Sequence, residues 1–292
     1  MEAGLAAIAC ALLAALLAAV GAVAQQKSAE SVPDSGPLLA RLIRAPRWWA
    51  GVVGDGGSYV VQAVALALGS VLVVQPLLVA SLLFALPLSA RWSGVRVSAR
   101  AWGLAVALAV ALAVFLVVGD PTEGGISAPA ERWALPLAGV LAVVVAATVV
   151  GSLRIGAQWR ALLLGTAAGA LYGVAVAFTK YVVDRLEHGV IPLVSSWQTW
   201  ALVAAGVTGF YLQQKAFQVG PLSASLPALT IAEPLAAVFL GISVLGERLQ
   251  TGDLGFVVVG LAVVVMLVTT LGLSRARAEV AEEGEERESP VP

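Results

Sequence analysis

Nine long apolar runs constrain this chain more than any other feature of its sequence. Each is built from Ala, Val, Leu and Gly and is bounded by charged or turn-forming residues; the runs fall near 3–24, 49–68, 70–90, 101–118, 133–151, 161–182, 198–219, 221–243 and 253–273. A helix needs about 20 apolar residues to cross a bilayer. Of the 292 residues 60% are hydrophobic and 12% charged, whereas soluble domains carry about 25% charged residues. These observations exclude a soluble domain or a disordered chain and predict an all-α polytopic membrane protein with about nine transmembrane helices.

The polar composition excludes several classes of site. The net charge of −1 provides no field that attracts nucleic acid. Cys10 is the only cysteine and His188 the only histidine, so neither a thiolate cluster nor a multi-histidine metal site can form. The sequence contains no Gly-Lys-Ser/Thr phosphate loop and no pair of mid-span aspartates. We therefore expect no enzyme activity, no cofactor and no nucleic-acid partner.

The basic residues are distributed asymmetrically between the two sides of the predicted helices. If the N-terminus faces outward, Arg132, Arg185 and Arg248 lie in outer loops, while Lys180 and Lys215 lie within or at the ends of spans and are expected to snorkel to the interface. The other basic residues all face inward: Lys27, Arg41, Arg44, Arg47, Arg91, Arg96, Arg100, Arg154, Arg160, Arg275, Arg277 and Arg287. Cytoplasmic loops are enriched in Lys and Arg. The sequence thus predicts a multi-pass plasma-membrane protein with its N-terminus outside and its C-terminus in the cytoplasm.

Three further patterns concern the spans and their ends. All eight tryptophans lie near predicted span ends, and indole prefers the membrane–water interface. Residues 274–292 are rich in glutamate and predict a disordered acidic tail in the cytoplasm. Gly165 and Gly169 are four residues apart, which predicts a face of close helix packing.

A weak internal repeat relates the two halves of the chain by an offset of 151 residues. The ungapped matches include Trp49 with Trp200, Ala50 with Ala201, Tyr59 with Phe210, Gln62 with Gln213, Gly69 with Gly220, and Pro76 with Pro227. This repeat assigns four spans to residues 1–118, a linker span to 119–160 and four spans to 161–273, with the tail at 274–292. A single linker span inverts the second copy, and inverted repeats are typical of secondary transporters. We therefore predict two inverted four-helix repeats that expose one central site to either side in turn.

The first candidate site lies in the second apolar run. Ionisable side chains at membrane depth are costly and mark candidate sites. Asp55 stands among Gly54, Gly56 and Gly57, which predicts an unwound or kinked helix whose free carbonyls join the carboxylate around a cation or polar substrate. The alternative is that Asp55 is hydrated near the inner interface.

The second candidate site lies in the eighth run. Glu233 precedes Pro234 and lies 12 or 13 residues beyond the turn at Gly220, or about 18 Å at 1.5 Å per residue, close to the bilayer midplane. Pro234 leaves a carbonyl free one turn earlier, and Pro76 and Pro227 are further candidate hinges. The alternative for Glu233 is a buried carboxylic acid kept neutral by its surroundings. Together, Asp55 and Glu233 are the candidate metal ligands.

Uncharged polar residues recur at related depths in the two halves. Gln62, Gln213 and Gln214 offer donors and acceptors, and Lys215 adds a charge beside them. We place these residues in a substrate or ion pathway. Glutamines in membrane helices also serve as ordinary interhelical hydrogen-bond partners, and that alternative stays open.

The second half resembles the drug/metabolite transporter superfamily. The stretch PALTIAEPLAAVFLGISVLGERL resembles the closing segment of its EamA-type members, with matching positions at Pro227, Glu233, Pro234, Gly246, Glu247 and Arg248. The first half is similar to the NIPA-type magnesium transporters of the same superfamily, at Trp48, Trp49, Gly54, Asp55, Tyr59, Pro76 and Leu77. By this resemblance Asp55 is the acidic position tied to divalent-cation passage, and Tyr59 belongs to the same pathway. Ten-span members have both termini inside, so nine spans agree better with the NIPA-type group.

These patterns and the resemblance together indicate a secondary transporter that works by alternating access. Its substrate is either a divalent cation such as Mg²⁺ or a small polar metabolite, and the sequence does not separate the two. Its other partner is the lipid bilayer, and a homodimer is compatible with the sequence. The alternative function is a non-transporting membrane scaffold or assembly subunit, which predicts no shared polar path between Asp55, Glu233 and the glutamines.

Overall fold

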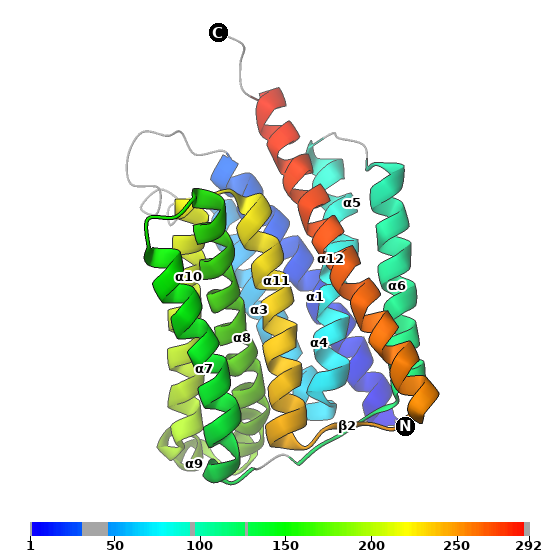
Figure 1. Cartoon of the computed structure of the whole chain (residues 1–292), viewed down its shortest axis with the longest axis vertical. Coiled ribbons are helices and arrows are strands. Elements are labelled where there is room, and N and C mark those ends of the chain that lie inside the picture. The colour runs from blue at the N-terminus through cyan, green and yellow to red at the C-terminus, as the bar shows by residue number, and fades with distance from the viewer. Residues whose placement is uncertain (1, 31–45, 94–96, 126–127, 289–292) are drawn as a thin grey trace.

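The computed structural model describes residues 2–30, 46–93, 97–125 and 128–288, and these form a bundle of long helices (Figure 1). The N-terminal group of helices comprises α1 (Glu2–Glu30), α3 (Pro46–Leu68), α4 (Val71–Val79), α5 (Ser81–Ser93) and α6 (Ala99–Gly119). After β1 (Pro121–Thr122) and α7 (Ala130–Ser152), the C-terminal group comprises α8 (Ala157–Glu187), α9 (Val190–Ser195), α10 (Trp197–Val219), α11 (Leu222–Leu240), the π-helical η1 (Gly241–Leu245), β2 (Arg248–Leu249) and α12 (Asp253–Glu288).

Helical segments occupy every predicted apolar run, and this confirms an all-α polytopic membrane fold. Within the described residues, seven stretches are long and apolar enough to cross a membrane: Gly4–Ala24, Val71–Arg91, Ala99–Gly119, Ala130–Ser152, Ala157–Leu186, Ser223–Leu245 and Asp253–Ala276. In α3 the apolar stretch Gly56–Leu68 is shorter, and α10 is not among the seven. The count of nine spans therefore stays a prediction.

Within each group the first helix packs along several of the others. In the N-terminal group α1 lies along α3 and contacts α4 and α5, while in the C-terminal group α8 lies along α10 and α11. The two groups meet where α12 packs on α6 and α5, α3 on α8, and α11 on α4. Helix α1 begins at one end of the bundle and α12 ends at the other (Figure 1).

Glycines on α8 allow the closest of these contacts. A Cβ atom on Gly165, Gly169 or Gly173 would lie 2.7, 2.4 or 2.4 Å from the carbonyl oxygens of Ser225, Leu229 and Glu233 on α11. Only glycine permits the two backbones to approach this closely. The predicted packing role of Gly165 and Gly169 is confirmed, and Gly173 extends the same face by one turn.

One expectation about helix interruption is wrong. Helix α3 is continuous across Gly54–Gly57, and its Gly54 and Ser58 lie against α1: a Cβ on Gly54 would lie 3.0 Å from the Cα of Gly21, and the Ser58 hydroxyl donates to the Ala14 carbonyl. Helix α11 continues through both of its prolines, and their role as hinges stays a prediction. The interruptions lie elsewhere, at Ala80 between α4 and α5 and in η1 at the end of α11.

One further expectation about the span ends is wrong, and one is confirmed. Helix α12 continues to Glu288 through the segment expected to be disordered, and the Ala, Arg and Glu residues of that segment have high helix propensity. Trp133 lies near the start of α7 as predicted, but it is only 1% exposed. It is stacked on Phe178 with ring centroids 4.5 Å apart and is edge-on to Trp197. Trp102, by contrast, is exposed as predicted.

Candidate functional site: a buried ion pair and two pockets

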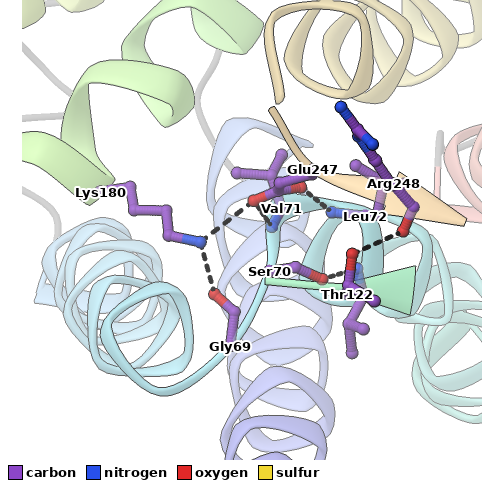
Figure 2. A network of polar contacts seen from close by, with 9 residues as sticks. Gly69, Ser70, Val71, Leu72, Thr122, Lys180, Glu247 and Arg248 are labelled. Carbon is purple, nitrogen blue, oxygen red and sulfur yellow. Dashed lines mark hydrogen bonds and ion pairs between the residues drawn. The ribbon is translucent and has the colours of Figure 1, made fainter. Parts of the chain in front are cut away.

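The carboxylate of Glu247 is the centre of a polar network at one end of the bundle (Figure 2). It is fully buried. Its two oxygens accept hydrogen bonds from the backbone N–H groups of Val71 and Leu72, at 2.8 and 2.9 Å. These are the first two residues of α4, so Glu247 acts as a cap from a distant part of the chain. A carboxylate is favoured there because the amino end of a helix carries partial positive charge and unpaired N–H groups.

Lys180 of α8 completes the network. Its ammonium group lies 3.0 Å from Oε1 of Glu247 and donates to the Gly69 carbonyl at 3.2 Å. Its side chain is 6% exposed, so the expectation that Lys180 snorkels to the interface is wrong. Two charges removed from water require this quality of pairing, since an unpaired buried charge costs several kcal/mol.

The chain reaches this geometry through a sharp local turn. The π-helical η1 ends at Leu245, and the φ of +71° at the next residue, Gly246, lies in the left-handed region that favours glycine. The backbone N–H of Glu247 then donates to the Gly241 carbonyl at 3.1 Å, which turns its side chain inward while Arg248 is exposed. A Cβ on Gly241 would lie 3.0 Å from Oε2 of Glu247, so this position also leaves room for the carboxylate.

A short two-stranded sheet covers the same end of the bundle. Pro121 and Thr122 of β1 pair antiparallel with Leu249 and Arg248 of β2, and the Thr122 hydroxyl donates to the Arg248 carbonyl at 3.1 Å. This strap connects the loop after α6 with the loop before α12. It lies beside the network in Figure 2.

Tyr59, a predicted pathway residue, lies close to this network. Its hydroxyl lies 2.6 Å from that of Thr179, the residue before Lys180. The Glu233 carboxylate has no hydrogen bond or ion pair with another residue whose side chain the structure describes.

The structure distributes the other predicted site residues over separate contacts. Gln213 accepts a hydrogen bond from the Tyr172 hydroxyl between α10 and α8, whereas Gln62 is buried with its amide nitrogen unpartnered among the described residues. Gln214 and Lys215 are exposed, and the Lys215 ammonium lies 5.9 Å from the centre of the Tyr211 ring. Asp55 lies within α3, but its side chain is outside the part of the chain that the structure describes.

Two adjoining pockets share residues of α11: the apolar pocket lies between the helix groups, and the polar pocket lies within the C-terminal group. The apolar pocket, with about 530 Å³ of empty space, is formed by α4, α6, α11 and α12 and is lined by residues such as Pro76, Phe115, Pro234 and Met266. The polar pocket, with about 730 Å³, is lined by α8, α11 and α12, including Gln158, Thr166, Ser223, Pro227 and Arg275. Ile231 and Leu235 line both pockets. Gln158, Ser223 and Arg275 are exposed, so the polar pocket opens at the end of α8 opposite to Lys180.

The sequence signal for the ion pair was present but ambiguous. Glu247 belongs to the Gly-Glu-Arg motif, and Lys180 is one of two lysines near span ends. Read singly, each side chain is compatible with a hydrated interface position. Their pairing spans 67 residues, and only the packing of α8 against the loop before α12 reveals it.

The fold and this site define a helical integral membrane protein with a charge network buried at one end of its bundle. The chain belongs to the same family as an uncharacterized protein of Corynebacterium glutamicum, to which it is 38% identical over 285 residues, or 94% of this chain and 96% of the relative. No family model matches the chain, and no solved structure matches it.

Proposed function

We propose that this protein is a secondary transporter that moves a small solute by alternating access. One observation carries the proposal: the polar pocket between α8, α11 and α12 opens at one end of the bundle, whereas Glu247, Lys180 and the strap close the other end. A site open to a single side is what one state of an alternating-access cycle requires. An integral scaffold has no need of such a cavity.

We further propose that the two helix groups are inverted repeats, with α7 as the linker. Related positions make related contacts in each group: a Cβ on Gly69 would lie 2.7 Å from Ala7 of α1, and a Cβ on Gly220 would lie 2.2 Å from the Ala157 carbonyl of α8. Corresponding helices also run in opposite directions, as α1 and α8 do in Figure 1. This arrangement and the charge distribution imply nine spans across the plasma membrane. The N-terminus then lies outside the cell and the C-terminus in the cytoplasm.

Of the two substrate classes, we favour a small organic solute over a divalent cation. Among the described residues, no carboxylate lines either pocket, and Arg275 is the one charged lining residue. The Glu247 carboxylate is already occupied by Lys180 and two backbone amides. Among the described residues there is no group of three or more His, Cys, Asp or Glu that could hold a metal ion. Magnesium binds through oxygen ligands, usually including carboxylates.

The test is solute flux into proteoliposomes containing the purified protein. A panel of radiolabelled amino acids, nucleosides, organic acids and Mg²⁺ would identify the transported class. Ala228 lines the polar pocket, so Ala228→Trp should reduce flux at least tenfold, while Val207→Trp on the exposed face of α10 should leave it unchanged. Absence of flux for every solute would favour the scaffold, and Mg²⁺ flux alone would overturn the preference for an organic solute. Equal flux in both tryptophan variants would place the pathway elsewhere.

A further inference from the structure

The Lys180–Glu247 pair connects parts of the protein that have to separate if the closed end is to open. Both charged residues belong to the C-terminal group, but the backbone groups that they bind, at Gly69, Val71 and Leu72, form the α3–α4 turn of the N-terminal group. The Tyr59–Thr179 hydrogen bond crosses the same seam between α3 and α8.

The chemistry of this contact suits reversible closure. Apolar side chains of similar volume hold a buried seam as well as an ion pair does. An ion pair, however, loses much of its advantage once water enters, since both charges are then solvated. The contact is therefore strong when water is excluded from this end of the bundle and weak when water enters it. A gate with two states behaves in this way.

Irregular backbone lies on both sides of the contact. Helix α4 is interrupted at Ala80, nine residues after Val71, and η1 is a single π-helical segment that is followed by the left-handed residue Gly246, immediately before Glu247. Segments of π-helix frequently occur at functional sites, and kinks form where the regular hydrogen-bond ladder is broken. The elements that hold the pair can thus move without unfolding α8 or α12.

We propose that Lys180 and Glu247 are the gate of this transporter, and that the α3–α4 turn is the element they release. The proposal rests on the transport function inferred above. In the structure the gate is closed and the polar pocket is open at the opposite end. In the alternate state the pair is separated and hydrated, and the polar pocket is closed.

Cysteine accessibility tests the gate directly. Val176 lies one helical turn from Lys180 on the same face of α8 and is 2% exposed. In a Cys10→Ser background, Val176→Cys should react slowly with a water-soluble maleimide. Adding Glu247→Gln or Lys180→Met should raise the labelling rate at least tenfold, because the closed end then opens more often. Unchanged labelling in correctly folded variants would overturn the gate. Lys180→Met retains the carboxylate cap on α4, so it remains informative if Glu247→Gln does not fold.

Cysteines at two more positions distinguish opening of the gate from general destabilisation of the protein. They also distinguish failure of the gate from failure of the transport proposal. Thr166→Cys in the polar pocket should label at least threefold more slowly when the gate is opened, and Leu108→Cys, fully buried on α6, should not change. Faster labelling at Leu108 as well would mean general destabilisation and would overturn the gate. Faster labelling at Val176 with no change at Thr166 would support the gate but contradict alternating access. Arg100→Gln and Arg154→Gln, which remove exposed charges, serve as controls that should alter neither rate.

Discussion

The buried ion pair makes a quantitative prediction about stability. Glu247→Leu leaves the Lys180 ammonium 6% exposed, with the Gly69 carbonyl as its remaining partner among the described residues. Removing one partner of a buried pair costs about 3–5 kcal/mol. Lys180→Met leaves Glu247 bound to the amides of Val71 and Leu72, so we expect a smaller loss of about 1–3 kcal/mol. In the double variant no charge is buried, and the remaining cost is that of the two uncapped amides, again about 1–3 kcal/mol.

The sign of the coupling is the critical result. The double variant should be more stable than Glu247→Leu alone, by about 2 kcal/mol, because the second substitution removes the stranded charge. Unfolding in mixed micelles, followed by circular dichroism, measures all four proteins under one condition. Additive losses, with the double variant the least stable, would refute the reasoning and mean that Lys180 is hydrated when Glu247 is absent.

Three further predictions concern packing, ion selectivity and topology. Gly169→Ala should destabilise the protein by about 1–3 kcal/mol through overpacking against α11, whereas Gly206→Ala, with no atom within 4 Å of the new Cβ, should be neutral or stabilising in the same unfolding assay. Asp55→Asn should leave the flux of an organic solute unchanged but abolish any Mg²⁺ flux; loss of both in the same vesicles would place Asp55 in a common pathway. A cysteine at Leu153, between α7 and α8, should be protected from impermeant reagents outside intact cells, and one at Glu123, in the strap loop, should be labelled. Labelling in the reverse pattern would invert the predicted orientation.

Much of the helical arrangement could be predicted because its causes are local. Apolar runs specify the helices, and Gly69 and the Gly220–Pro221 step specify hairpins, since α4 begins at Val71 and α11 at Leu222. Gly165 and Gly169, four residues apart on α8, predicted a close helix contact, although they did not indicate that the partner is α11. The glycines around Asp55 misled for the same reason: small residues serve both helix packing and helix breaking, and a sequence does not distinguish the two uses.

The site was less predictable because its parts are distant in sequence. Proline pattern and membrane depth drew attention to Glu233, while Glu247 stood out only as part of the Gly-Glu-Arg motif. In the structure Glu247 forms an ion pair and a helix cap, and Glu233 has neither among the described side chains. The depth of a residue in the membrane follows from its position along a span. The partner of its side chain depends instead on which helices and loops pack against it.

The sequence by itself determined that this chain inserts into a bilayer as a set of apolar helices with tight hairpins, because hydropathy and backbone hydrogen bonding act over one or two turns. Only the tertiary structure decided that a lysine of α8 and a glutamate before α12 close one end of the bundle on the first turn of α4. This closure depends on contacts between residues up to 176 positions apart. A buried charge needs a partner, but the local sequence around it does not indicate which residue that partner is.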